Sequence, residues 1–280
     1  MQSSNNFVFH NYLIDYYYRK LYNVHSYILG RRKALYMIRL ILVVLFVVLF
    51  LILSIPLLIV EYFIGKWKPE VKDRSSLAIV NWAFRCVLFL AGTSITVIGE
   101  ENVPKDEPVL YIGNHRSYFD IVMTYIRVPR PTGYIAKIEM LKIPLLSHWM
   151  KYLHCLFLDR NDIKQGMKII LTAIDKVKSG ISICVFPEGT RNKVPDTFME
   201  FHEGTFKIAA KTGCPIIPMA INNAGQIFED HIPWIKKTHV VLEYGKPIYV
   251  KDLDKEAQRH VGATVQSIIK EMYFKNKELV

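Results

Sequence analysis

A long hydrophobic run lies near the start of the chain. From Leu40 to Val60 the sequence LILVVLFVVLFLILSIPLLIV contains no charged residue. An α-helix rises ~1.5 Å per residue, so this run is long enough to cross a hydrocarbon core of ~30 Å. A buried helix of a soluble protein is the alternative, but such a helix would need apolar partners on every face. The pattern favours a membrane anchor, a helix over about residues 36–64 that Pro56 kinks near its end.

A second apolar stretch runs from Leu77 to Gly92 and contains Asn81, Trp82 and Arg85. It is short for a span, and it predicts an amphipathic or re-entrant helix over about residues 76–92. Basic residues flank the first run on both sides: Arg31, Arg32, Lys33 and Arg39 before it, and Lys66, Lys68, Lys72 and Arg74 after it. The positive-inside rule therefore does not orient a single span. The flanks favour a hairpin with both ends in the cytosol, while a true span with an outside N-terminus stays open.

After Gly92, short apolar runs alternate with longer amphipathic segments. This pattern predicts an α/β fold, a mostly parallel sheet flanked by helices. The expected strands are Ser94 to Ile98, Val109 to Gly113, Ile181 to Phe186, Ile216 to Ile221 and His239 to Tyr244. The expected helices are Phe119 to Ile126, Ile163 to Val177, Phe206 to Lys211 and Lys255 to Tyr273. We therefore divide the chain into a membrane-anchoring region, residues 1–92 with its helix pair, and one globular domain, residues 93–280.

The chain is basic, with a formal net charge of +11 and a pI of about 9.3. That excess suits anionic lipid surfaces, phosphorylated substrates or nucleic acid, and a generally basic soluble surface explains it equally well. The sequence contains no recognisable nucleic-acid-binding module, so we expect no nucleic-acid partner. The four cysteines, Cys86, Cys155, Cys184 and Cys214, have neither disulfide-framework nor metal-site spacing. Reduced cysteines favour the cytosol for the globular domain, and we expect no metal.

One candidate for catalysis follows the second expected strand. His115 comes directly after PVLYIGN, and Ser117 with Asp120 forms a Ser-x-x-Asp pattern that opens a helix. Asp120 then lies in the first turn, where the helix dipole favours its ionised form. A carboxylate near an imidazole can select its tautomer and support it as a base. Taken alone, the pattern more often marks an ordinary helix cap beside a loop histidine.

A second candidate is the segment Phe186 to Arg191, FPEGTR, which follows another expected strand. Parallel strands end at the same edge of a sheet, so this segment should lie near His115. Gly189 permits close approach of the backbone to a ligand, and Arg191 suits two-pronged contact with phosphate. By itself the segment could be a solvated surface turn.

Taken together, four blocks in order make the chain resemble the glycerolipid acyltransferase family, the lysophosphatidic acid acyltransferases and their relatives. The blocks are Asn114 to Asp120 (NHRSYFD), Leu156 to Arg160 (LFLDR), Phe186 to Arg191 (FPEGTR) and Cys214 to Pro218 (CPIIP). Lys137, in AKIEMLKIP, also matches, and the resemblance covers roughly residues 94–249 and includes the helix pair. The chain departs from the family at Ser147-His148, where many relatives have glycine, and at Asn192, where serine is frequent.

The resemblance implies transfer of a fatty acyl group from an acyl thioester to the sn-2 hydroxyl of 1-acyl-sn-glycerol 3-phosphate, forming phosphatidic acid in phospholipid biosynthesis. It implies that His115 is the general base and that Asp120 supports it. The expected substrate-binding residues are Arg191, Glu188, Gly189, Thr190, Lys137, Arg160 and Arg116. Ser117 is expected to be a cap rather than a nucleophile, because the chain lacks the GxSxG elbow. Neither a metal, a cofactor nor a covalent acyl-enzyme is needed.

The expected partners are membrane phospholipids, lysophosphatidic acid and either acyl-CoA or acyl carrier protein as the thioester co-substrate. The expected location is the cell membrane, with the catalytic domain facing the cytoplasm. Two alternatives stay open: an acyltransferase for another acceptor (glycerol 3-phosphate, another lysophospholipid or an amino-acid lipid), and a non-catalytic lipid-binding scaffold. Because a scaffold needs no base beside a carboxylate, His115 and Asp120 speak against it.

Overall fold

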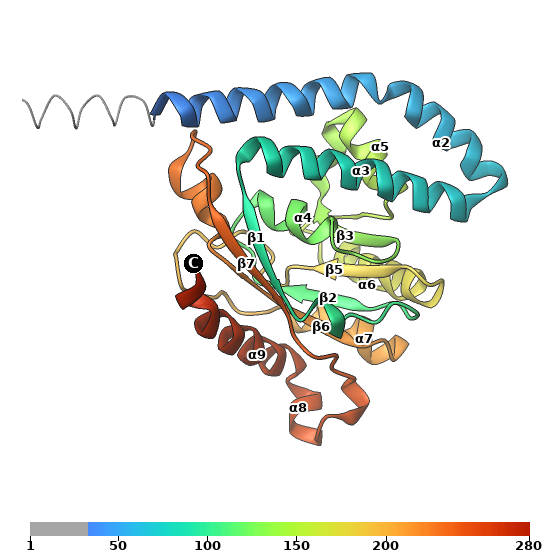
Figure 1. Cartoon of the computed structure of the whole chain (residues 1–280). Coiled ribbons are helices and arrows are strands. Elements are labelled where there is room, and N and C mark those ends of the chain that lie inside the picture. Colours follow the sequence, from blue (N-terminus) through green and yellow to red (C-terminus); the bar gives the residue numbers. More distant parts are fainter. Residues whose placement is uncertain (1–32) are drawn as a thin grey trace, which may run out of the picture.

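A mixed sheet with helices on both faces forms the globular part of the molecule (Figure 1). The computed structural model describes residues 33–280. In that range the strands are β1 (Ser94–Ile98), β2 (Leu110–Gly113), β3 (Thr132–Lys137), β4 (Leu156–Leu158), β5 (Ser182–Val185), β6 (Ile216–Asn222) and β7 (His239–Tyr244). Their order across the sheet is β1-β7-β6-β2-β5-β3-β4. Strands β2 to β6 are mutually parallel, while β7 is antiparallel to β6 and parallel to β1. The predicted α/β fold with a mostly parallel sheet is confirmed.

All five predicted strands are present, but sequence analysis missed β3 and β4 at one edge of the sheet. Strand β4 has only three residues. In β3 the strand pattern is interrupted by Gly133, a residue with low strand propensity. A Cβ atom at Gly133 would lie only 2.3 Å from the carbonyl oxygen of His154, so the fold requires glycine there for close backbone approach.

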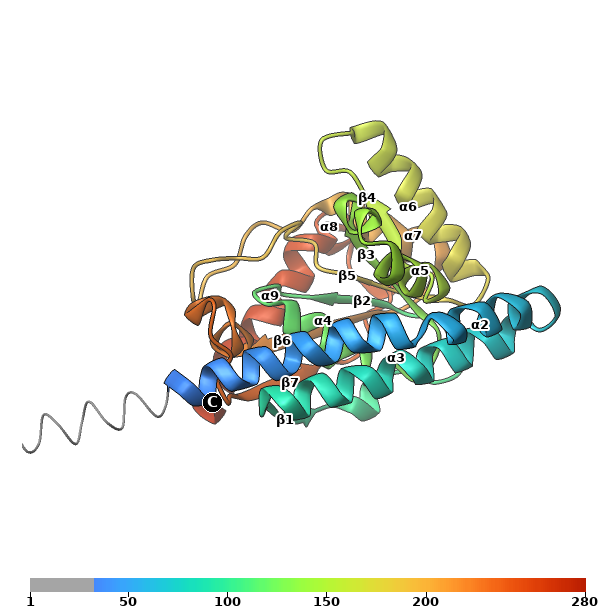
Figure 2. The same ribbon diagram turned by 90° about the horizontal axis from the view of Figure 1, so that it is seen from above.

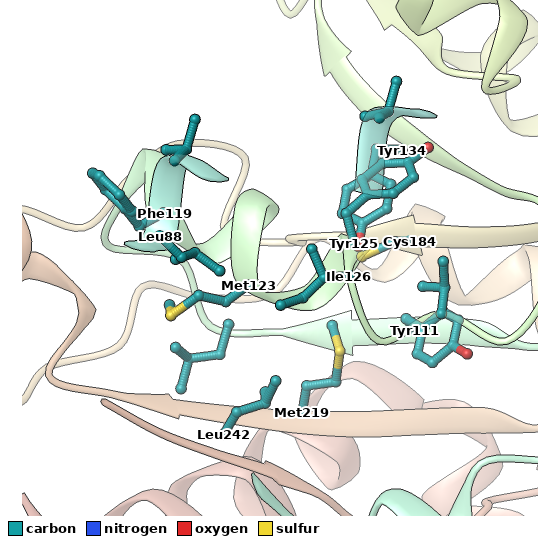
Figure 3. Packing of buried hydrophobic residues seen from close by; sticks show 14 of the residues in the cluster. Leu88, Tyr111, Phe119, Met123, Tyr125, Ile126, Tyr134, Cys184, Met219 and Leu242 are labelled. Atoms are coloured by element: carbon teal, nitrogen blue, oxygen red, sulfur yellow. The ribbon is translucent and has the colours of Figure 1, made fainter. Parts of the chain in front are cut away.

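Helices on each face of the sheet bury their apolar side chains against it. One face packs against α3 (Pro69–Ala91), α4 (Tyr118–Tyr125) and α5 (Pro144–Tyr152), and the other against α6 (Ile163–Lys178), α7 (Lys207–Thr212) and α9 (Val261–Lys275). Strand β2 shows the alternation: Tyr111 joins the first core, while Leu110 and Ile112 join the second. Figure 3 shows the first core, where Met123 of α4 lies over Met219 and Leu242 of the sheet.

The prediction of one C-terminal helix from Lys255 to Tyr273 was wrong. The chain breaks at His260 into α8 (Lys255–Arg259) and α9. The carboxylate of Glu203, far away in sequence, accepts hydrogen bonds from the backbone N–H of Gly262 at 3.0 and 3.1 Å. This contact satisfies a donor in the first turn of α9, so a new helix begins there.

The N-terminal region forms a helical hairpin that lies along the α3 side of the domain (Figure 2). A helix over Lys33–Leu53 is followed, after a break at Ser54, by α2 (Ile55–Trp67), and α3 then runs back beside them. The break falls two residues before Pro56, as the predicted kink requires. By length and composition, Lys33–Leu53 and α3 are both candidate membrane spans.

Helix α3 begins at Pro69, earlier than the predicted start near residue 76. Its polar first turns form a helix with Pro69 at the first position and contain an ion pair, with Lys72 Nζ 3.0 Å from Asp73 Oδ1. The flanking residues Arg31 and Arg32 lie outside the described range.

Helix α5 attaches the hairpin to the globular domain. The indole N–H of Trp149 donates to Ser54 Oγ at 2.9 Å, and the hydroxyl of Tyr152 donates to the carbonyl of Leu58 at 3.0 Å. Both bonds engage hairpin residues at or near the helix break. Sequence analysis predicted no helix over this segment and noted only the departure at Ser147-His148. In the structure both residues lie within α5.

Candidate active site

The expected functional residues gather where the parallel strands end. His115 follows β2, Glu188 follows the adjacent β5, Lys137 ends β3, and Arg160 follows β4. Since these strands are parallel, all four positions lie at the carboxyl edge of the sheet. Adjacent strands are ~4.8 Å apart, so β3 and β4 lie about 10 and 14 Å from β2 along the sheet. His115 and Glu188 are therefore neighbours, while the exposed Lys137 and Arg160 lie farther along the same edge.

Asp120 organises the loop that carries His115. Its Oδ2 atom accepts three hydrogen bonds, all at 2.8 Å, from His115 Nδ1 and from the backbone N–H groups of Arg116 and Ser117. The carboxylate is 1% exposed and lies in the first turn of α4, where the helix dipole stabilises its negative charge. Because Nδ1 must donate to the carboxylate, Nε2 is the ring nitrogen that can accept a proton.

The predicted capping box is confirmed. Ser117 Oγ accepts a hydrogen bond from the backbone N–H of Phe119 at 3.0 Å, and the Asp120 side chain completes the box. Ser117 is fully buried. Its hydroxyl oxygen is engaged in capping α4, which agrees with its expected role as a cap.

The ring of Phe186 fixes the plane of the His115 imidazole. The two rings are stacked, with centroids 4.3 Å apart and planes inclined by 14°. Phe186 opens the FPEGTR segment, so this segment supports the histidine directly. Together, Phe186 and Asp120 hold the imidazole by its face and by one nitrogen, which restricts its rotation.

Two residues of the same region hold the backbone of His115. The His115 N–H donates to Glu188 Oε1 at 3.0 Å, and the His115 carbonyl accepts from the Asn192 N–H at 2.7 Å. Glu188 Oε2 accepts from the N–H of Met199 at 3.1 Å. Burial raises the pKa of Glu188, and these backbone donors oppose that rise. Glu188, expected to bind substrate, therefore holds the loop of His115 here, and Asn192, treated as a minor departure, does so too.

Gly189 and Asn114 complete this scaffold. Gly189 has a φ of +71°, and a Cβ atom there would lie 3.1 Å from His202 Nε2, so its conformation favours glycine. Thr190 is half-buried in the same segment. The amide of Asn114 donates to the carbonyl and accepts from the N–H of Ile221, both at 2.9 Å. This pair of bonds joins the end of β2 to β6, and sequence analysis gave Asn114 no role of its own.

Two arginines lie at the rim of the site, each paired with a carboxylate. Arg191 stacks on the ring of Tyr118, with its guanidinium carbon 3.6 Å from the centroid, and its Nη1 lies 3.0 Å from Glu229 Oε1. The same oxygen accepts from the N–H of Tyr118 at 2.8 Å. Arg116 Nη2 lies 2.8 Å from Asp230 Oδ1. We call these four charged residues the rim.

Sequence analysis missed Glu229 and Asp230. They lie in a short 3-10 turn, Glu229–His231, that follows the carboxyl end of β6. Their place after a strand that ends at the catalytic edge was the signal available, but no motif marks them. Within the described range, residues 33–280, no group of three or more His, Cys, Asp or Glu side chains is arranged to hold a metal ion.

The site therefore offers an oriented imidazole beside a buried carboxylate, with cations next to it. An imidazole in this setting can accept a proton from a hydroxyl group. Arginine forks suit the oxygens of a phosphate or a carboxylate.

Comparison with known proteins shows which family the chain is similar to. The family model described as Acyltransferase matches residues 94–222. The 1-acyl-sn-glycerol-3-phosphate acyltransferase of Borreliella burgdorferi is 30% identical over 207 residues, 74% of this chain and 81% of that protein. The enzyme of the same name from Saccharomyces cerevisiae is 26% identical over 198 residues, 70% of this chain and 64% of that protein.

A solved structure shares the fold. The crystal structure of the 1-acyl-sn-glycerophosphate (LPA) acyltransferase PlsC from Thermotoga maritima aligns with a TM-score of 0.74 at 22% identity, covering 87% of this chain and 98% of that one. From the extent of its likeness to the Borreliella protein, this chain belongs to the acyltransferase family that includes the 1-acyl-sn-glycerol-3-phosphate acyltransferases.

Proposed function

We propose that this protein transfers a fatty acyl group from an acyl thioester to the sn-2 hydroxyl of 1-acyl-sn-glycerol 3-phosphate, forming phosphatidic acid. The observation that carries the proposal is the 2.8 Å contact between His115 Nδ1 and Asp120 Oδ2, with Arg116 and Arg191 close by. This combination supplies a base for a hydroxyl and cations for a phosphate. The names of the related proteins support the same acceptor.

In the proposed mechanism, Nε2 of His115 accepts the proton of the acceptor hydroxyl while its oxygen attacks the thioester carbonyl. An ester C–O bond forms, the C–S bond breaks, and the proton passes from His115 to the leaving thiolate. The charge of Asp120 stabilises the imidazolium that forms in between. The acyl group moves directly to the acceptor, so the proposal uses neither an acyl-enzyme, a metal nor a resident cofactor.

The acceptor phosphate is assigned to the rim arginines. Arg116 supports this assignment because its Nη1 is buried without a hydrogen-bond partner, which leaves a donor for a phosphate oxygen. Lys137 and Arg160 are assigned to the farther part of the substrates along the same edge. Glu188, Gly189 and Thr190 are assigned to the wall beside the acceptor, with Glu188 acting through the His115 loop.

The donor is assigned as acyl-CoA or acyl carrier protein, since both present a thioester on a phosphopantetheine arm. The two candidate spans support a location at a membrane, where the proposed lipid acceptor resides. We assign the catalytic domain to the cytoplasmic side, because the basic residue Arg39 lies beside Gly92 at the open end of the hairpin, where the chain continues into the domain.

The test is acyl transfer by the full chain, purified in detergent, with labelled acyl-CoA and acyl carrier protein as separate donors. Lysophosphatidic acid, lysophosphatidylcholine, glycerol 3-phosphate and an amino-acid lipid serve as acceptors. His115→Ala is expected to lower transfer by roughly 10²–10⁴-fold. The matched control is His260→Ala, an exposed histidine between α8 and α9, which is expected to keep full activity.

The acceptor that yields product decides between the alternatives. Phosphatidic acid formed by the wild type, and lost in His115→Ala, supports the proposal. Product on another acceptor alone would keep the base and replace the substrate. If neither donor gave His115-dependent transfer to any acceptor on folded protein, a lipid-binding scaffold would replace the enzyme.

A further inference from the structure

A cavity lies at the edge of the sheet opposite to that of His115. It has a volume of about 570 Å³ and lies between α3 and the loop that leads into β3. Its lining residues are Arg74, Leu77, Ala78, Asn81, Lys105, Pro129, Arg130 and Pro131. Arg130 and Pro131 directly precede β3, and the cavity therefore lies at the amino ends of the parallel strands, away from the catalytic edge.

The charges around this cavity are all positive. Arg74 comes from α3, Lys105 from the segment before β2, and Arg130 from the segment before β3. Among the described residues that line it there is no carboxylate, and none of the three cations forms an ion pair within residues 33–280. Three cations that converge without an anion repel one another. A bound anion would remove that repulsion.

Arg130 shows a second, independent sign of a missing ligand. Its Nη2 donates to the carbonyl of Gly180 at 3.0 Å, which holds the guanidinium in place. Its Nε and Nη1 atoms are buried and have no hydrogen-bond partner among the described residues. Buried polar groups are almost always paired, and leaving a charged donor unpaired is costly. A phosphate oxygen is a strong acceptor for a single arginine N–H.

The surroundings of the cavity point to a lipid as the source of the phosphate. Arg74, Ala78, Trp82, Arg85 and Phe89 recur every three or four positions along α3 and are all partly exposed. Within the stripe, Trp82 packs against Phe46 and Phe50, and Arg85 Nη2 donates to the carbonyl of Ile126. Trp82 is 57% exposed and Phe89 83%. A stripe that mixes arginines with aromatic side chains is typical of a helix at the interface of a bilayer. The cavity opens beside the start of this stripe, at Arg74 and Ala78.

We propose that the cavity of Arg74, Lys105 and Arg130 binds the phosphate headgroup of an anionic phospholipid. The lipid is neither acceptor nor product of the acyl transfer, because the site lies at the opposite edge of the sheet from His115. Its binding holds the start of α3 at an anionic bilayer, beside the candidate membrane helices.

The experiment measures lipid binding by the full chain in a non-ionic detergent, with isothermal titration. Short-chain phosphatidylglycerol is the probe, and short-chain phosphatidylcholine corrects for nonspecific binding to the apolar helices. The test variant is Arg74→Gln with Lys105→Gln, two exposed positions whose substitution leaves the core unchanged. The control, Lys255→Gln with Arg259→Gln on α8, removes the same two charges from a distant exposed helix.

We expect the wild type to prefer phosphatidylglycerol and the test variant to bind it roughly tenfold to thirtyfold more weakly, with the control unchanged. Arg191→Gln should keep this binding, because Arg191 belongs to the catalytic rim. Equal binding by the test variant and the wild type would overturn the proposal. Binding lost in Arg191→Gln would place the lipid in the catalytic site instead. Inorganic phosphate that competes as well as the lipid would overturn the assignment to a lipid. None of these readouts depends on acyl transfer.

Discussion

The centre of the site, His115 with Asp120, and the rim hold their charges in different ways. At the centre, the negative charge of Asp120 is held by one imidazole and two backbone N–H donors, and its side chain is 1% exposed. At the rim, Arg191 is 33% exposed and is held by another side chain, Glu229. Backbone donors cannot leave, whereas a side-chain carboxylate can be exchanged for a phosphate. The centre is therefore preorganised for a chemical step, and the rim for exchange of anions.

The largest expected effect comes from neutralising the centre with Asp120→Asn. The amide oxygen can still accept from the backbone, but it no longer stabilises a protonated His115. We expect kcat to fall by roughly 10²–10⁴-fold with little change in the acceptor KM. Steady-state kinetics with lysophosphatidic acid, together with Tm, checks this. A loss below about tenfold in a folded variant would show that the centre does not depend on the Asp120 charge.

The next effect comes from Arg191→Lys at the rim. Lysine keeps the charge but loses both the fork and the stacking on Tyr118. Hydrogen bonds to charged groups contribute ~1.5–3 kcal/mol, so we expect the acceptor KM to rise roughly tenfold or more while kcat is largely kept. Arg259→Lys on α8 is the matched control. A fall in kcat with constant KM would place Arg191 in the chemical step. The proposed difference between the centre and the rim would then be wrong.

A smaller effect of opposite sign is expected from Glu229→Gln. The amide oxygen can still accept from the Tyr118 N–H and from Arg191, but the competing negative charge is gone. Partly exposed ion pairs are worth ~0–1 kcal/mol, so the acceptor KM should fall by up to about fivefold. Titration of lysophosphatidic acid in the transfer assay measures this. A rise in KM would instead mean that the carboxylate positions Arg191 for the substrate.

The smallest effect is on the pH dependence of stability and comes from the buried side chain of Glu188. Burial raises its native pKa above the ordinary value of 4.5, so the native state holds this proton more tightly than the unfolded chain. The contribution of Glu188 to stability is therefore complete below pH 4.5 and is lost as pH rises through the native pKa. Glu188→Gln should lack this loss, so its Tm should fall less than that of the wild type as pH rises through that window. Identical Tm profiles against pH would contradict the raised pKa.

Local sequence was enough to predict those parts of the site whose contacts join residues only a few positions apart in the chain. The cap of Ser117 and Asp120 lies within four positions, so its geometry follows from helix periodicity, and the structure contains the predicted capping box. The apolar run from Leu40 to Val60 predicts its helix in the same way, because length and hydropathy are properties of the segment itself. The five recognised strands likewise lie in short, mostly apolar runs.

What sequence patterns missed depends on contacts between distant segments. Glu229 is 38 positions from Arg191, and Glu188 is 73 positions from His115, so neither pair leaves a periodic signal. The break between α8 and α9 follows from Glu203, which lies 59 positions from Gly262.

By itself, the sequence determined the long apolar helix, the α/β class and the motif residues, because each of these depends on residues that are close together in the chain. Only the tertiary structure decided which charges meet. It turned Glu188 inward onto the His115 loop and gave each rim arginine a carboxylate. It also gathered Arg74, Lys105 and Arg130 around one cavity. The physical reason is that a charge interacts with whatever the fold brings within a few ångströms, however far apart the residues lie in the chain.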